Sequence, residues 1–166
     1  CGAVSKGDEL FKSSAIFGVL GASNKSKIDE MLGKSEPFYE LGDLNFIDKN
    51  IVSNYENHTK AFIKIQEGCD FACSYCIIPS VRGFSRSIDE DIILKEAKTL
   101  ASNGYSEIVL TGTNIGSYGK SVGTSLGRLV AHLGKINGIK RIRLGSIEPS
   151  QIDESFREIL HEPWLE

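Results

Sequence analysis

The feature that most limits the fold of this chain is a strand–helix pattern that occurs three times after residue 60. The predicted strands are residues 61–66, 107–111 and 140–144. The predicted helices run from a capping box at Ser87 and Glu90 to Asn103 and Gly104, from Thr124 or Ser125 to Ile136, and from Asp153 to His161. Alternating strands and helices predict a parallel sheet with right-handed crossovers. Three units cannot close a barrel, so we predict an α/β fold that is the first half of a (β/α) barrel. The alternative is a small open α/β sheet.

The chain before this pattern is less regular. An apolar run at residues 15–20 predicts a buried strand, and residues 26–32 predict a helix with Ser26 as its N-cap. Residues 34–60 show no sustained period, and we expect there a linker with one short strand near residues 46–47. The predicted domains are 1–34, a linker at 35–57, and 58–166.

Three cysteines, Cys69, Cys73 and Cys76, follow the first predicted strand of the pattern. A cubane iron–sulfur cluster normally takes one cysteine on each iron, so three thiolates leave one iron open to another ligand. We therefore predict a 4Fe–4S cluster with one open coordination position.

Other cysteine sites fit this spacing less well. Structural zinc usually takes four Cys or His ligands, and the histidines at 58, 132 and 161 are distant in sequence. A redox pair would need only Cys73 and Cys76 and would leave Cys69 unexplained. A disulfide framework is disfavoured because four cysteines in 166 residues without a signal peptide fit a reducing compartment.

The composition limits the class of protein that this chain can belong to. The chain is 40% hydrophobic, which is enough for a sizeable core, and its net charge of −3 is not typical of a nucleic-acid-binding domain. No apolar run approaches the roughly 20 residues that cross a bilayer, so we expect no membrane partner. The chain begins at Cys1 rather than at Met, and no helix stop precedes Glu166, so we expect a piece of a longer protein.

The segments that follow the predicted strands are expected to meet. In (β/α) folds the site is built from loops at the carboxyl ends of the strands. The cysteine segment, residues 111–119 and residues 145–149 all occupy such positions. We therefore expect them at one edge of the sheet.

Strand alternation predicts which side chains face the interior of the barrel. Phe62, Lys64 and Gln66 share one side of their strand, opposite two isoleucines. Arg141 and Arg143 likewise share one side. If the aliphatic sides meet the helices, the polar sides line a wet lumen, and Arg143 needs an anionic partner, either Glu148 or a cofactor carboxylate. The alternative is a sheet face that simply solvates these charges.

The cysteine segment carries a specific resemblance. Residues 58–79, followed by Arg82, Gly83 and residues 85–87, resemble the radical domain of methylthiotransferases, which are radical S-adenosylmethionine enzymes. Residues 110–119 and 141–149 resemble most the class that acts on tRNA threonylcarbamoyladenosine. Gly145 departs from that class, which commonly has Ser there. Classes acting on isopentenyladenosine of tRNA or on a ribosomal protein remain alternatives.

The resemblance implies roles for particular residues. Cys69, Cys73 and Cys76 would hold the 4Fe–4S cluster, whose open iron binds S-adenosylmethionine. Tyr75 would lie near the adenine or act as a wedge that orders its loop, and Arg86 would pair with the cofactor carboxylate or form a surface ion pair. The other predicted cofactor contacts are Gly112 at the amino group and Asn114, Ser146 and Glu148 at polar groups. No catalytic residue is assigned.

The resemblance also implies a wider context. Cys1 would be one ligand of a second 4Fe–4S cluster in an amino-terminal domain, of which residues 1–34 would be the last part. The expected partners are a tRNA substrate and an electron donor such as flavodoxin or ferredoxin, in the cytoplasm. We expect this chain alone to be inactive. The alternative of another class is a non-catalytic zinc-binding α/β module.

Overall fold

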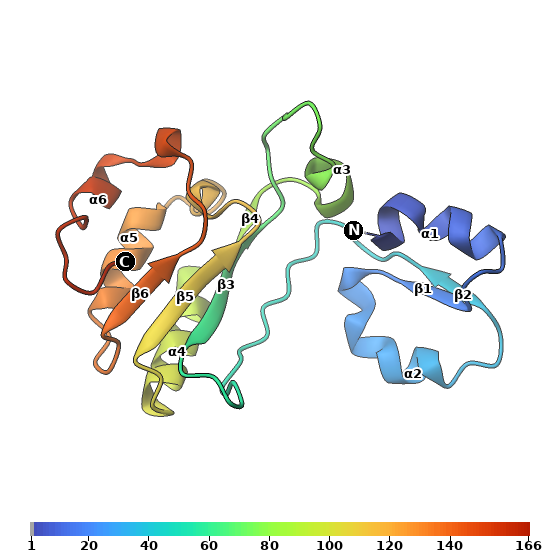
Figure 1. Ribbon diagram of the computed structural model, residues 1–166, viewed down its shortest axis with the longest axis horizontal. Coiled ribbons are helices and arrows are strands. Elements are labelled where there is room, and N and C mark those ends of the chain that lie inside the picture. Colours follow the sequence, from blue (N-terminus) through green and yellow to red (C-terminus); the bar gives the residue numbers. More distant parts are fainter. Residues whose placement is uncertain (1) are drawn as a thin grey trace. The chain divides into compact units, whose positions relative to one another are not determined.

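The computed structural model describes residues 2–166 and divides them into two compact units (Figure 1). The amino-terminal unit comprises the residues up to Asp48 together with Asp70–Phe84. The sheet unit comprises Lys49–Cys69 and Ser85–Glu166. Cys1 lies outside the described residues. The three-part domain scheme drawn from the sequence stays a prediction.

The amino-terminal unit has a two-stranded parallel sheet with short helices. Its elements are α1 (Gly2–Lys12), β1 (Gly18–Leu20), a 3₁₀ helix (Ala22–Lys27), α2 (Ile28–Leu32), β2 (Phe38–Glu40) and α3 (Ile78–Arg82). Val19 of β1 and Met31 of α2 are buried. A Cβ at Gly7 would lie 3.1 Å from Val19 Cγ1, so α1 packs closely on β1.

Three sequence predictions for this unit were wrong in detail. Ser26 does not cap α2, because residues 22–27 form a 3₁₀ helix and Lys27 takes the cap position. The linker prediction missed β2, whose Tyr39 pairs with Val19. No strand forms at residues 46–47, because Asp43 turns the chain there by accepting the backbone N–H of Asn45 at 2.8 Å.

The sheet unit follows the predicted strand–helix order. Its elements are β3 (Ala61–Glu67), β4 (Arg86–Ser87), α4 (Glu90–Ser102), β5 (Glu107–Gly112), α5 (Leu126–Gly134), β6 (Arg141–Leu144) and α6 (Glu154–Arg157), with 3₁₀ helices at Ile115–Ser117 and Pro149–Gln151. The strand order is β4-β3-β5-β6. β5 pairs in parallel with both β3 and β6, and only β4 is antiparallel. The fold is therefore mixed α/β with a parallel centre, as predicted.

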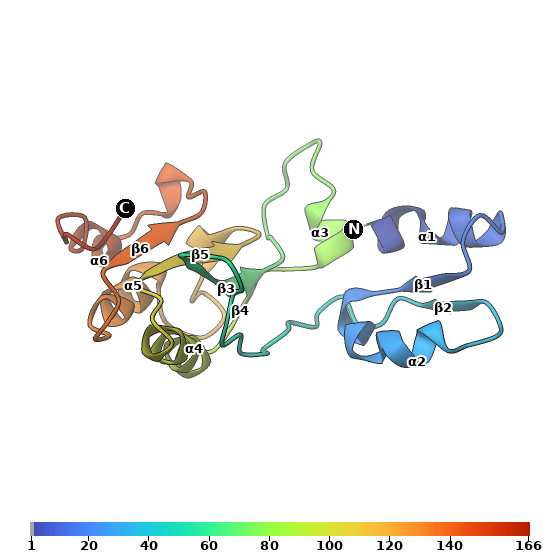
Figure 2. The ribbon, with the colours of Figure 1, turned by 60° about the horizontal axis from the view of Figure 1, so that its bottom comes forward.

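One face of this sheet carries the core. α4 and α5 lie on the same face (Figure 2). The aliphatic side chains that alternate along the strands are fully buried, namely Ile63, Ile65, Ile108, Leu110 and Ile142. The helices contribute Ile93, Ala97, Leu100, Leu129, Val130 and Leu133. The aliphatic sides of the strands thus meet the helices, as expected, whereas Phe62, Lys64 and Arg143 on the other side are half-buried.

The helix starts agree only partly with the sequence predictions. Ser125 caps α5, as one of two predicted residues, and Asp153 caps α6 by accepting the backbone N–H of Phe156 at 2.9 Å. The capping box at Ser87 was wrong. Ser87 of β4 pairs with Gln66 of β3. The hydroxyl of Ser87 accepts the backbone N–H of Gly119 at 2.9 Å, so this hydroxyl is not available to cap α4.

The second half of the predicted linker packs on the sheet unit. The backbone N–H of Val52 donates to Glu96 Oε1 at 3.1 Å, and that of Tyr55 donates to the hydroxyl of Tyr105 at 2.8 Å. Asn103 Nδ2 donates to the carbonyl of Ser53 at 2.7 Å. This segment is therefore held along α4 before the chain enters β3.

Candidate functional site

The carboxyl ends of the parallel strands meet at one edge of the sheet unit. Gly68 and Cys69 follow β3, residues 113–119 follow β5, and Gly145 begins the segment after β6. The N–H of Gly145 donates to the carbonyl of Leu110 at 3.1 Å. The predicted convergence of these segments therefore holds in the sheet unit.

The cysteine segment begins directly at this edge. Gly68 has φ 76°, a left-handed conformation that glycine adopts without strain, and it turns the chain as β3 ends. Cys69 is buried with 9% of its surface exposed, whereas Cys73 and Cys76 are exposed. In the described part of the chain none of the three thiols is in a disulfide.

Cys69 belongs to the sheet unit and Cys73 and Cys76 to the amino-terminal unit, so the joint binding of a cluster by the three thiols stays a prediction. Among residues 2–166, no set of three or more His, Cys, Asp and Glu side chains lies close enough to hold a metal ion. Cys73 and Cys76 are joined by a backbone turn in which the N–H of Cys76 donates to the carbonyl of Cys73 at 3.1 Å. Cys1 lies outside the described residues, so its predicted role as a cluster ligand stays a prediction.

Two predicted residues, one at the end of β5 and one just after it, lie beside Cys69 and Gln66. Asn114 Nδ2 donates to Cys69 Sγ at 3.7 Å. A Cβ at Gly112 would lie 2.9 Å from the carbonyl oxygen of Gln66 and 3.0 Å from its Oε1. The absence of a side chain at Gly112 thus makes room for Gln66, and close approach of a cofactor there stays a prediction.

Four further predicted residues lie in other segments of the chain. Ser146 and Glu148 after β6 are exposed. Arg86 lies in β4 opposite Glu67 of β3. Tyr75 is 93% exposed, and both of its predicted roles, beside the adenine or as a wedge that orders its loop, stay predictions. Contact of any of these residues with a cofactor is not tested by the structure.

Glu148, one of the two predicted partners of Arg143, was wrong. Arg143 Nε donates to Glu107 Oε1 at 2.7 Å, and its Nη2 lies 3.0 Å from Glu166 Oε2. Glu107 is on the neighbouring strand β5, so strand pairing, rather than the Glu148 loop, supplies the anion. The hydrogen bond from Arg143 lowers the pKa of Glu107, and the same bond raises the pKa of Arg143.

Gln66 is a site residue that the sequence did not identify as one. Its alternation with Lys64 predicted only a place in the lumen, yet the side chain is fully buried and contacts the segments after both β3 and β5. A polar residue just before a cysteine segment is a weak signal, and the change of register that buries it is not readable from sequence.

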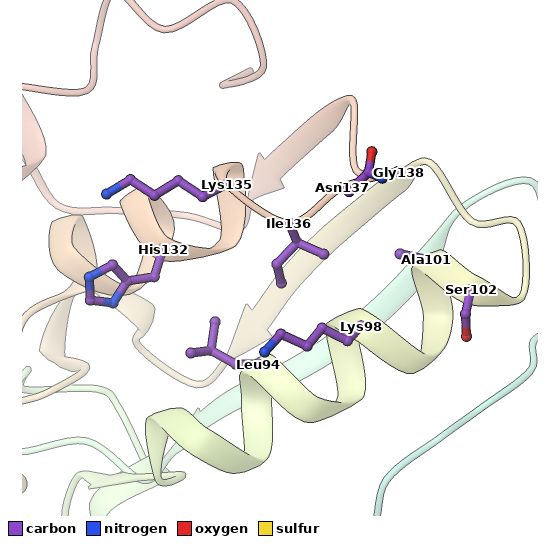
Figure 3. A pocket seen from close by; sticks show the side chains of 9 residues that line it. All are labelled: Leu94, Lys98, Ala101, Ser102, His132, Lys135, Ile136, Asn137 and Gly138. Carbon is purple, nitrogen blue, oxygen red and sulfur yellow. The ribbon is translucent and has the colours of Figure 1, made fainter.

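Two pockets of the sheet unit are lined by residues other than those of the candidate site. A pocket of about 730 Å³ lies between the carboxyl-terminal half of α4 and the end of α5 (Figure 3). Leu94 and Ile136 line it, with Lys98 and Lys135 at its sides. A second pocket, of about 270 Å³, lies between the start of α5 and residues 150–153. Neither contains a predicted site residue.

No helix within residues 2–166 combines the length and apolar character that crossing a membrane requires.

Comparison with known proteins identifies the family. The family described as "Radical SAM superfamily" matches residues 63–162, which is well over half of the chain. The chain therefore belongs to the radical S-adenosylmethionine superfamily.

Individual relatives show which members of the superfamily this chain is similar to. The chain is 49% identical over 168 residues to a Helicobacter pylori (strain J99) protein named as a methylthiotransferase, covering 100% of this chain and 40% of that protein. It is 35% identical over 164 residues to the tRNA-2-methylthio-N(6)-dimethylallyladenosine synthase of Wolinella succinogenes, covering 95% and 38%. It is 34% identical over 169 residues to the threonylcarbamoyladenosine tRNA methylthiotransferase MtaB of Bacillus subtilis, covering 96% and 38%.

These relatives confirm the resemblance to methylthiotransferases that the cysteine segment predicts. They include types named for different adenosine substrates, so they do not select one substrate class. The chain spans about two fifths of the length of the relatives it matches.

Proposed function

We propose that this chain is part of a radical S-adenosylmethionine methylthiotransferase that modifies an adenosine of tRNA. The observation that carries the proposal is the position of the Cys69–Cys73–Cys76 segment directly after the first strand of a parallel α/β sheet. Membership of the superfamily and the names of the relatives support it.

The proposed architecture is larger than the described sheet. In the proposal, β3, β5 and β6 are the first three strands of a (β/α) barrel, and the half-buried face with Lys64 and Arg143 would turn toward its interior. Residues 1–34 would belong to a preceding domain, with Cys1 as one ligand of a second 4Fe–4S cluster.

The residues present fit a 4Fe–4S cluster by their chemistry. Three cysteines outside any disulfide supply thiolate donors, and an amide N–H from Asn114 points to one of the sulfurs. Cys69, Cys73 and Cys76 would hold the cluster. When bound and reduced, the cluster supplies the electron that splits the sulfonium of S-adenosylmethionine into methionine and a 5′-deoxyadenosyl radical.

The binding and orientation of S-adenosylmethionine are assigned to residues of this chain. In the proposal, Gly112 and Asn114 orient the amino acid part of S-adenosylmethionine at the end of β5. Ser146 and Glu148 offer a hydroxyl and a carboxylate from the segment after β6, and Arg86 offers a cation for the carboxylate. Tyr75, whose ring is exposed, is available to stack on the adenine. Together these side chains would orient the cofactor and exclude water from the radical.

The proposed substrate is the threonylcarbamoyladenosine of tRNA, as residues 110–119 and 141–149 suggest. Isopentenyladenosine is the second candidate, because relatives with a dimethylallyladenosine name are as similar to the chain as those with the threonylcarbamoyl name. A flavodoxin or ferredoxin in the cytoplasm would supply electrons.

Mass spectrometry of tRNA nucleosides tests the proposal. We predict that Cys73→Ala in the chromosomal gene abolishes the 2-methylthio form of threonylcarbamoyladenosine and leaves the unmodified precursor. The matched control Asn103→Ala, which removes an amide that donates to the carbonyl of Ser53, should keep the product. Loss of the isopentenyl product instead would overturn the substrate class, and loss of neither would overturn the assignment to tRNA.

A further inference from the structure

A buried carboxamide joins the two segments that meet at the end of β3. Gln66 is 0% exposed, and its Nε2 donates to the carbonyl of Gly68 at 2.7 Å, the carbonyl of Glu67 at 3.0 Å and Ser85 Oγ at 2.9 Å. Its Oε1 accepts the backbone N–H of Asn114 at 2.8 Å. One side chain therefore contacts the chain before the cysteines, the chain before β4 and the segment after β5.

A change of register places this side chain in the interior. Pairing between β3 and β5 shifts between Lys64 and Gln66, so that Gln66 lies opposite Gly112. Ile65 and Gln66 are consequently both buried, which regular alternation would not allow. Any residue larger than glycine at position 112 would meet Gln66 O at 2.9 Å and Ile115 Cγ2 at 2.9 Å.

The contacts of Gln66 bear directly on Cys69. Gly68, whose carbonyl accepts from Gln66, is the residue before Cys69. Asn114, whose N–H is held by Gln66, is the residue whose Nδ2 lies 3.7 Å from Cys69 Sγ. Gln66 thus fixes both ends of the contact between the amide donor and the sulfur.

Stability is a weak explanation for this arrangement. Burying a carboxamide requires its hydrogen bonds to offset the loss of water, so the net gain over an apolar residue is small. What the hydrogen bonds add is a fixed position for two loops.

We propose that Asn114 sets the reduction potential of the cluster through its N–H···S contact with Cys69, and that Gln66 is the positioning residue that holds this contact. The inference rests on the proposed function, because it requires that Cys69 is a cluster ligand. A hydrogen bond to a ligand sulfur withdraws electron density and makes the cluster easier to reduce. Its loss lowers the potential.

A redox titration followed by electron paramagnetic resonance tests the role of Asn114. In the anaerobically reconstituted protein, Asn114→Ala should shift the equilibrium roughly tenfold toward the oxidised cluster, or about 59 mV for one electron. Asn114 is only half-buried, so the variant is expected to fold. Asn103→Ala, which removes an amide that donates to Ser53 at 2.7 Å, should leave the potential unchanged. An unchanged potential in Asn114→Ala would overturn the proposal.

Gln66→Met tests the positioning role, because Met has a similar length and forms no such hydrogen bonds. Hydrogen exchange of the cluster-free protein should be faster at the amide of Asn114, and the potential should fall in the same direction as in Asn114→Ala. The double variant should shift no further than one variant alone. Additive shifts would show that Gln66 acts by another route.

Iron content separates this inference from the proposed function. If the unaltered protein assembles no cluster, the proposed function fails, and the exchange of the Asn114 amide still reports whether Gln66 holds the loop. If the cluster assembles and its reduction potential is the same in both variants as in the unaltered protein, only the inference fails.

Discussion

At the scale of single residues, Glu107 is the charged centre of the half-buried sheet face. It accepts Arg143 Nε at 2.7 Å and Arg141 Nη1 at 3.2 Å. Both arginines also pair with Glu166, Arg141 Nε at 2.7 Å and Arg143 Nη2 at 3.0 Å. This network ties β5 and β6 to the chain around Leu165, which forms a parallel bridge with Ile142.

The lowered pKa of Glu107 predicts a pH-dependent contribution to stability. A carboxyl whose pKa is lower in the folded state stabilises the protein at pH values above its ordinary pKa, and loses this effect as the pH falls through the folded value. Urea unfolding of the protein and of Glu107→Gln should therefore differ at neutral pH and converge in acid. The difference should be modest because the arginines are partly exposed. A difference that grows in acid would contradict this assignment.

Sequence reasoning could find some of these residues and not others. Cys69, Cys73 and Cys76 stand out because three thiolates at short spacing have few chemical uses. Arg143 was correctly expected to need an anion, but Glu107 could be chosen only once the register of β5 and β6 was known. Gln66 was hidden for the same reason, since a shift in register moved it into the interior.

At the scale of elements, local capping sets where the last helix begins. Asp153 Oδ1 accepts the backbone N–H of Phe156 at 2.9 Å and the hydroxyl of Ser155 at 2.7 Å. The helix packs against α5, where a Cβ at Gly127 would lie 2.3 Å from the nitrogen of Phe156. The cap therefore orders a segment that touches α5 at backbone distance.

Removal of this cap should weaken the helix. Asp153→Ala is expected to lower the free energy of unfolding by about 1 kcal/mol, the usual loss for a deleted N-cap. Asp153→Asn keeps a good cap and should remain close to the unaltered protein. The measurement is urea denaturation of both variants. Equal losses in both would show that the charge rather than the cap matters.

Elements with a strong period were predicted close to their observed bounds, whereas β1 is shorter than the strand predicted at residues 15–20 and β2 was missed. β3, β5, β6 and α5 were found because their apolar residues repeat over a whole element and end at turn residues. β1 and β2, with three residues each, carry too little pattern for their bounds to be read. Ser26 and Ser87 look like caps in sequence, but a 3₁₀ helix and a strand pair take those positions.

At the scale of the whole molecule, the parallel strands of the sheet determine where the candidate site residues lie. Three parallel strands put the segments after β3, β5 and β6 at one edge, and α4 and α5 cover one face only. The chain spans about two fifths of its relatives, which fits the proposal that the sheet is the beginning of a barrel. The sequence could predict the edge where the segments meet, because parallel strands that alternate with helices end at the same side of a sheet.

The central claim is that Cys69, Cys73 and Cys76 leave one iron of a cluster open for S-adenosylmethionine. The most direct measurement is electron paramagnetic resonance of the anaerobically reconstituted, dithionite-reduced protein with and without S-adenosylmethionine. We predict a brown protein with a reduced-cluster signal that changes when S-adenosylmethionine is added. A signal that does not change when S-adenosylmethionine is added, or a colourless protein that binds zinc, would contradict the claim.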